Sequence, residues 1–209
     1  MNRFFNRFFF AVSLAAFGLL ASFPAAAADG FDRLPPNPAG KSNGLLIRIV
    51  EYAGSTNGAI TVDVKNPTDK PQEFSAKGVY FVPQGNANEA PQRLGAVGPF
   101  QVHNAAGPAR RDQMTIAAGA TERLTLDVYC IDSHRSSPSS STGFRVAKDR
   151  VPPALTKAID ADASRSAAAA GGFSAPAAKS AVQSEVWKNR DKKWIELDGE
   201  GKQEASKSR

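Results

Sequence analysis

The sequence predicts a mainly β fold, an immunoglobulin-like antiparallel β-sandwich followed by a C-terminal helical extension. Short segments that alternate apolar and polar residues recur at intervals of about ten residues between positions 44 and 132. Turn residues separate these segments, whereas the residues beyond 150 repeat apolar side chains at helical spacing. Two facing sheets can bury one face of each such strand within about 100 residues.

The clearest of the expected strands lies at the end of this region. There the apolar side chains would share one face and the remaining ones the other, with Leu124, Leu126, Val128 and Cys130 opposite Thr125, Asp127 and Tyr129. The other expected strands lie within residues 45–50, 59–64, 74–82, 93–102 and 114–116. The cysteine pair that usually links the two sheets is absent, so the prediction concerns the architecture only.

Two helices are expected after the sandwich. Pro152 or Pro153 can open the first, because proline is tolerated in the first turn of a helix. The second is expected over residues 175–189, and its apolar face is formed by Ala178, Ala181, Val182, Val186 and Trp187. This face needs an apolar partner, so we expect the helix to dock on the sandwich.

The predicted organisation of the chain has four parts. Residues 1–28 are expected to be a cleavable secretory signal, because a positively charged start precedes an uncharged apolar run that ends in small residues. Residues 29–43 indicate a linker, residues 44–132 the sandwich, and residues 133–209 a loop and helical extension with a polar tail. We therefore expect a secreted or periplasmic protein of the cell envelope, with no membrane span after signal cleavage.

The charges favour some classes of partner over others. The chain has 26 basic and 20 acidic residues, and the two signs are interspersed along it. A nucleic-acid-binding protein typically carries a basic stripe or patch, and the sequence has no such run. The expected partner is therefore another protein or a surface ligand, and not nucleic acid.

The densest group of reactive side chains surrounds the single cysteine and consists of Tyr129, Cys130, Asp132, His134 and Arg135. If the strand continued past Cys130, then Cys130, Asp132 and His134 would project on one face. One interpretation is a nucleophilic thiol whose pKa is lowered by His134 or Arg135. No oxyanion-hole motif accompanies it, so an enzyme is the least favoured interpretation.

A second interpretation is a metal site. Cys130 and His134 offer sulfur and nitrogen ligands, and His103 and Met114 supply further soft or borderline donors. The spacing from His103 to Met114 resembles part of the periplasmic copper chaperones of the His-Met type, which are also small exported sandwiches. This alternative implies a periplasmic protein that binds Cu or Zn, whereas the other interpretations need no cofactor.

A third interpretation pairs the cysteine with a distant glutamine. Residues 129–132 and 182–187 resemble two motifs of the bacterial thioester domains of surface adhesins. In that family a thiolate attacks a glutamine carboxamide, ammonia leaves, and the remaining thioester can be opened by an amine such as a partner's lysine. The resemblance implies Cys130 as the thiol, Gln183 as the acyl partner and Trp187 as a shield against water.

The expected function is therefore a non-enzymatic binding or adhesion protein, either without covalent chemistry or with a thioester of Cys130 and Gln183 that captures amines, and the metal-binding protein is the alternative. Each residue also has a simpler interpretation. Cys130 would then be a small buried hydrophobe, Gln183 a solvated helix residue, Trp187 a core residue and Asp132 a turn cap.

Overall fold

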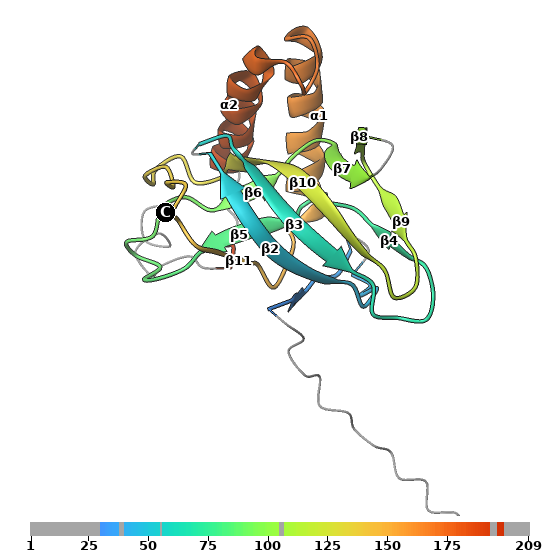
Figure 1. Cartoon of the computed structure of the whole chain (residues 1–209). Coiled ribbons are helices and arrows are strands. Elements are labelled where there is room, and N and C mark those ends of the chain that lie inside the picture. The colour runs from blue at the N-terminus through green and yellow to red at the C-terminus, as the bar shows by residue number, and fades with distance from the viewer. Residues whose placement is uncertain (1–29, 38–39, 55, 105–106, 193–195, 199–209) are drawn as a thin grey trace, which may run out of the picture.

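The computed structural model describes residues 30–37, 40–54, 56–104, 107–192 and 196–198. Within them the chain is mainly β, with antiparallel sheets and two C-terminal helices (Figure 1). This coarse fold class confirms the prediction. The predicted signal sequence and most of the predicted polar tail lie outside the described residues.

The strands and helices have the following bounds. The strands are β1 (Asp32–Arg33), β2 (Leu46–Ala53), β3 (Ala59–Lys65), β4 (Gln72–Phe74), β5 (Tyr80–Pro83), β6 (Leu94–Ala96), β7 (Phe100–Asn104), β8 (Gly107–Arg111), β9 (Met114–Ile116), β10 (Thr121–Cys130) and β11 (Phe144–Val146). The helices are α1 (Pro153–Ala169) and α2 (Pro176–Lys192).

β10 is the longest strand described and connects the parts of the large sheet, whose strand order is β1-β2-β3-β10-β6-β5-β11. One edge of β10 pairs with β3 from Thr121 to Asp127. The other edge pairs first with β7 at Leu124 and Thr125, and then with β6 from Val128 to Cys130. β8 pairs with β7, and β4 and β9 form a separate two-stranded sheet. The amides of Val128 and Cys130 also donate to the carbonyls of Gly58 and Thr56, so the end of β10 is held on both edges.

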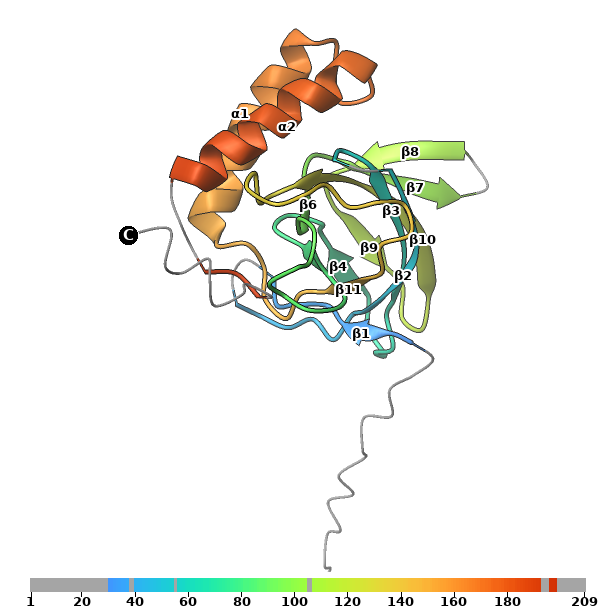
Figure 2. The same ribbon diagram turned by 90° about the vertical axis from the view of Figure 1, so that its left-hand side faces the viewer.

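The large sheet curls into a nearly closed barrel (Figure 2). β2 lies near one end of the strand order and yet contacts β11 at the other end. Tyr52 of β2 and Phe144 of β11 meet edge to face, with ring centroids 5.1 Å apart. A sandwich has two facing sheets, whereas one curled sheet surrounds most of the core here. The immunoglobulin-like sandwich is therefore not confirmed and stays a prediction.

The buried apolar side chains form two clusters. The barrel cluster fills the interior of the sheet and includes the face of β10 that carries Leu124, Leu126, Val128 and Cys130. The helix cluster lies between the outer face of the sheet and the two helices, and Tyr129 and Ile131 belong to it. The alternation predicted for β10 is thereby confirmed, and Cys130 lies on the predicted apolar face.

The two helices pack against each other as a hairpin, and α2 also contacts β10 (Figures 1 and 2). α1 begins at Pro153, as predicted, and the predicted docking of α2 on the β-domain is confirmed. The buried face of α2 includes polar residues that the sequence pattern did not place there, namely Gln183, Asn189 and Arg190. In the part of the chain that the structure describes, each helix falls short of the length and apolar character that crossing a bilayer requires.

The β-domain extends past its predicted limits of 44 and 132 on both sides. β1 lies in the segment predicted as a linker and pairs with β2. β11 lies in the predicted loop and helical extension and pairs with β5. These strands contain only two and three residues, so they are too short to show an alternating pattern.

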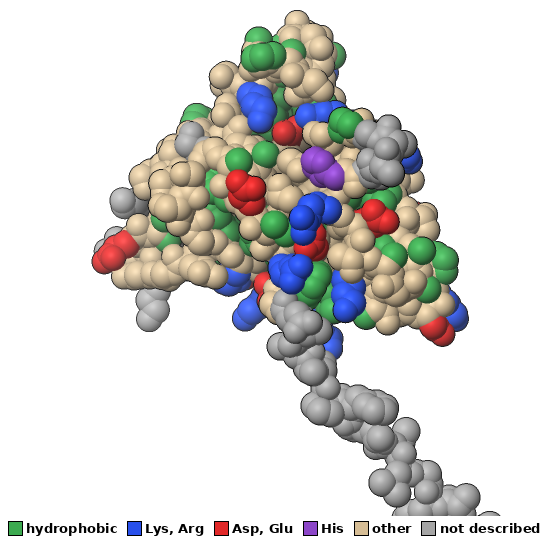
Figure 3. All heavy atoms as spheres, viewed as in Figure 1, with side chains coloured by type: hydrophobic (Ala, Val, Ile, Leu, Met, Phe, Trp, Pro, Cys, Tyr) green, Lys and Arg blue, Asp and Glu red, His purple; other side chains and the backbone are tan. Residues whose placement is uncertain are grey.

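The outer face formed by β2, β3 and β10 carries charges of both signs. Figure 3 shows Lys and Arg side chains lying among Asp and Glu side chains on this face. Asp63 accepts hydrogen bonds from Arg48 at 2.7 Å and Arg123 at 2.8 Å, and Asp127 accepts one from Arg110 at 2.7 Å. Acidic side chains therefore lie between the basic ones, and the basic side chains do not form one continuous stripe on this face.

A glycine pair tests how closely the helical hairpin packs on the barrel. Gly98 has φ +80°, and a Cβ built there would lie 2.6 Å from the Phe173 ring, whereas Gly119 has φ +71° and open space around it. Gly119→Ala should lower the free energy of unfolding by about 1–2 kcal/mol through backbone strain alone. Gly98→Ala should lower it by more, because the ring must also move. Urea denaturation measures both, and equal losses would contradict the packing of Phe173 on Gly98.

Candidate functional site

The carboxamide of Gln183 lies against the main chain of Cys130. The backbone amide of Cys130 donates to Oε1 of Gln183 at 2.9 Å, and Nε2 of Gln183 donates to the carbonyl oxygen of Cys130 at 2.7 Å. Cys130 is 0% exposed and Gln183 is 3% exposed. The two residues that the thioester interpretation requires to be neighbours are therefore brought together, in a buried environment.

This contact forms where the ladder of β10 ends. Buried backbone amides and carbonyls need hydrogen-bond partners, and the end of a strand leaves some of them without a neighbouring strand. The amide of Cys130 also donates to the carbonyl of Thr56 in the β2–β3 loop at 3.0 Å. Gln183 supplies the partner for the carbonyl of Cys130, so its side chain continues the hydrogen bonding of the sheet from the helix side.

The thiol of Cys130 belongs to the barrel cluster, whereas its neighbours Tyr129 and Ile131 face the helices. The hydrogen bonds of Gln183 join its carboxamide to the main chain of Cys130 and not to the sulfur. The sulfur is attached through Cβ to the Cα that lies between these two main-chain groups. The carboxamide therefore lies beside the main chain of Cys130, whereas the thiol points into the barrel.

The surroundings of Cys130 disfavour a thiolate. Burial raises the pKa of its thiol to about 12, and the negative charge of Asp132 adds to this rise. β10 ends at Cys130, so the condition for a shared face with His134 is not met. His134 lies exposed in the following turn, and Arg135 donates to the carbonyl of Ala90 at 3.1 Å. The local environment therefore does not support a cysteine nucleophile activated by His134 or Arg135.

Asp132 forms a completely buried ion pair with Arg93. Arg93 donates from Nε to Oδ2 of Asp132 at 2.8 Å and from Nη2 to Oδ1 at 2.5 Å, and both side chains are 0% exposed. Burial by itself would raise the pKa of Asp132, but the hydrogen bonds and the positive charge of Arg93 together hold the pKa of this carboxyl below its usual range. The positive charge of Arg190 on α2 acts in the same direction. The side chain of Asp132 therefore forms a buried ion pair and does not act as the turn cap of the simpler interpretation.

Three polar or aromatic residues of α2 follow one helical face at spacings of four and three residues. Gln183 contacts Cys130 as described, and Trp187 donates its indole N–H to Oε1 of Gln92 at 3.1 Å. Arg190 is buried near enough to Asp132 to influence its pKa. We call this set of contacts the polar seam, which consists of Gln92, Arg93, Cys130, Asp132, Gln183, Trp187 and Arg190. The two motifs that resemble thioester domains therefore meet along it.

The segment after α2 returns to the barrel beside the polar seam. Arg93 donates from Nη1 to the carbonyls of Leu197 and Asp198, both at 3.2 Å. The backbone amide of Asp198 donates to the hydroxyl of Tyr80 at 2.8 Å, and its carboxylate accepts from Arg145 at 2.8 and 3.2 Å. Both the buried face of α2 and the segment that follows the helix are thus tied to the β-domain.

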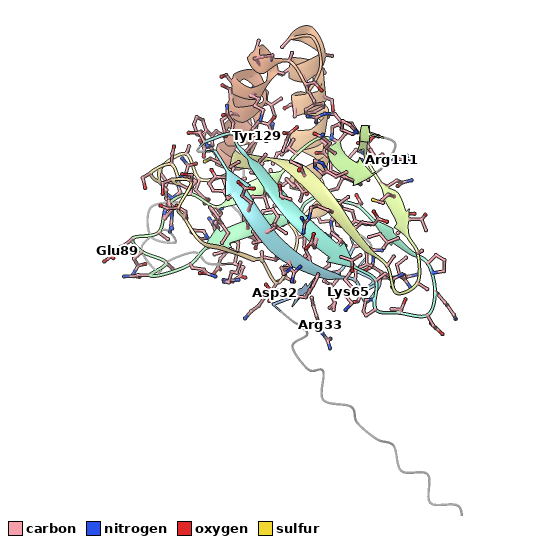
Figure 4. The ribbon with its side chains drawn as sticks, in the orientation of Figure 1. Asp32, Arg33, Lys65, Glu89, Arg111 and Tyr129 are labelled. Atoms are coloured by element: carbon pink, nitrogen blue, oxygen red, sulfur yellow. The ribbon has the colours of Figure 1, made fainter. Side chains whose placement is uncertain are left out.

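Tyr129, predicted to support the site, lies at the junction of the barrel and the helices (Figure 4). Burial raises the pKa of its phenol above the ordinary value, and the nearby charge of Asp127 adds to the rise. In the described part of the chain its hydroxyl is buried without a hydrogen-bond partner. The ring therefore acts as an apolar contact between β10 and the helices.

The four donors of the alternative metal site lie apart. His103 shares a hydrogen bond of 2.7 Å with Thr125 on the outer face of β10, opposite the face that carries Cys130. Met114 lies half-buried on β9 in the separate two-stranded sheet, and His134 is exposed. Among the residues that the structure describes, no three His, Cys, Asp or Glu side chains are grouped as a metal site would need.

The sequence analysis missed three members of the polar seam, namely Gln92, Arg93 and Arg190. Arg93 and Asp132 are separated by 39 residues in the chain, so no local pattern links them. A weak signal existed for Arg190, because it follows Gln183 and Trp187 at helical spacing. Comparisons with protein-family models, curated proteins and solved structures find no match for this chain.

The role of Gln183 in docking α2 can be measured by removing its hydrogen bonds while keeping its size. Gln183→Met should lower the free energy of unfolding by about 1–3 kcal/mol, because the carbonyl of Cys130 would lose its buried partner. Gln113 is exposed, so the control Gln113→Met should change the free energy of unfolding by less than about 0.5 kcal/mol. Urea denaturation of both variants provides the comparison. Equal effects would show that the carboxamide does not hold the helix.

The ion pair predicts a specific pH dependence of stability. The pKa of Asp132 is lower in the folded chain than its unfolded value near 3.9, so its contribution is complete above about pH 4 and is lost as the pH falls through the folded pKa. Asp132→Asn should lower the free energy of unfolding at pH 7 by about 3–5 kcal/mol, because Arg93 stays charged and buried.

The variant should also lose less stability than the parent protein when the pH is lowered below about 4. Urea denaturation over a pH series measures this difference. Asp69→Asn is the matched control, because Asp69 is exposed, and its curve should run parallel to that of the parent. A parallel curve for Asp132→Asn would contradict the assigned ion pair.

Proposed function

We propose that this chain is an exported binding or adhesion protein of the cell envelope or extracellular space that captures amines through an internal thioester between Cys130 and Gln183. One observation carries the proposal. The paired hydrogen bonds of Gln183 with the main chain of Cys130 hold an acyl group beside the cysteine. The other partner of the reaction would be a primary amine on a protein or surface ligand.

The chemistry balances without a cofactor. The sulfur of Cys130 bonds to the carboxamide carbon of Gln183, the carbon–nitrogen bond breaks, and the nitrogen leaves as ammonia with the thiol proton. Because burial raises the pKa of the thiol to about 12, we expect this step to be a slow single event. An incoming primary amine then forms a new amide with the acyl carbon, and the sulfur leaves and regains a proton.

Exclusion of water supports the proposal. A thioester persists only where hydrolysis is slow, and both partner residues are buried between the barrel and α2. Trp187, one helical turn after Gln183, packs against the barrel cluster and is fixed by its hydrogen bond to Gln92. Its half-buried ring would limit the entry of water at this end of the helix.

Two further parts of the proposal rest on the sequence pattern. Export depends on the signal-like residues 1–28, which lie outside the described residues. The immunoglobulin-like class would suit a surface-binding module, and we retain it as part of the proposal. The Cu- or Zn-binding alternative has no observation in its favour, because its donors lie on different faces and sheets of the domain.

The thioester can be tested by the intact mass of the purified mature protein. The mass should be lower than the sequence mass by one ammonia, and incubation with methylamine should add the mass of one methylamine. Cys130→Ala and Gln183→Ala should each abolish both changes, whereas the control Gln113→Ala should retain them. A full sequence mass, with Cys130 alkylated completely after denaturation, would exclude the thioester.

A further inference from the structure

Two strand edges face the gap in the nearly closed barrel. β1 pairs only with β2, and β11 pairs only with β5, in the part of the chain that the structure describes. Figure 4 shows Asp32 and Arg33 of β1 at the lower edge of the barrel. Unpaired edges of this kind are the surfaces to which an extended peptide can add as a further strand.

The hydrogen-bond pattern identifies which backbone groups point away from the existing partners. In an antiparallel pair, successive residues direct their N–H and C=O groups alternately toward the neighbouring strand and away from it. Leu34 donates to Leu45 at 3.0 Å, so Arg33 points away from β2. Ala147 donates to Tyr80 at 3.0 Å, so the backbone groups of Val146 and Phe144 point away from β5.

A cavity of about 490 Å³ lies between these two edges. Its lining comes from residues 32–36 and 42 on one side and from residues 145–148 on the other. Leu34 and Val146 are buried and supply apolar surface, whereas Arg33 and Lys148 are exposed. The volume falls within the range of about 300–1,000 Å³ that is usual for ligand pockets.

The charge of the lining favours an acidic ligand. Arg33, Arg145 and Lys148 line the cavity together with a single acidic residue, Asp32. One carboxylate is already bound beside it, because Asp198 accepts from Arg145 and from the backbone amide of Lys148 at 3.3 Å. Residues 199–209 of the chain itself carry more basic than acidic residues, so they complement this lining poorly.

We propose that this cavity docks an extended acidic segment of a partner protein, which adds as a strand between β1 and β11. The segment's backbone would pair with Arg33 on one side and with Val146 on the other. Its apolar side chains would face Leu34 and Val146, and its carboxylates would lie near Arg33 and Lys148. This proposal is independent of the thioester, because it uses neither Cys130 nor Gln183.

The test uses the mature full chain and a blocked peptide of alternating glutamate and valine as the probe. Calorimetric titration should show that this peptide binds at least about tenfold more tightly than a counterpart with lysine in place of glutamate. The double variant Arg33→Glu, Lys148→Glu should reverse the preference, and both side chains are exposed, so the fold should persist. The control double variant Lys70→Glu, Arg111→Glu should keep the preference for the acidic peptide.

Amide hydrogen exchange locates the bound peptide. The glutamate–valine peptide should slow exchange at Arg33 and Val146, and an N-methylated version should not, because it cannot complete the strand pairing. Equal binding of the acidic and basic peptides, or protection elsewhere, would overturn the proposal. So would self-association of the chain that the double variant abolishes, because a second copy would then occupy the cavity.

Discussion

The fold depends most on one constraint, which is that the buried polar groups of α2 must find partners at the end of β10. Gln183 meets the main chain of Cys130, and Arg190 lies near the carboxylate of Asp132. Burying such groups without partners is unfavourable, so a helix shifted by one turn would lose both contacts. The apolar face makes α2 dock, and the polar residues determine where it docks.

The position of the polar seam explains why the candidate site is buried. It lies between the barrel cluster and the helix cluster, and Arg93 links it to the segment at Leu197 and Asp198. The same packing that buries the carboxamide also keeps the Cys130 thiol protonated. A reactive bond formed there would therefore be slow to form and well protected from water.

The sequence predicted the parts of the fold that long, regular patterns encode. The alternation along β10 placed Cys130 on the buried face, and helical spacing predicted both helices and the docking of α2. β1 and β11 are too short to carry a pattern, and Arg93 is distant in the chain from Asp132. Polar residues such as Gln183 and Arg190 are assigned to solvent by periodicity, so only the resemblance to thioester domains singled out Gln183. The spacing of the proposed metal donors could not show that they lie on different faces.

The central claim is that the sulfur of Cys130 and the carboxamide carbon of Gln183 become covalently joined. Peptide mapping of the mature protein by tandem mass spectrometry at low pH tests this most directly. The account predicts a single cross-linked species that contains both residues and lacks one ammonia. Two separate linear peptides, one with an intact thiol and one with an intact carboxamide, would contradict it.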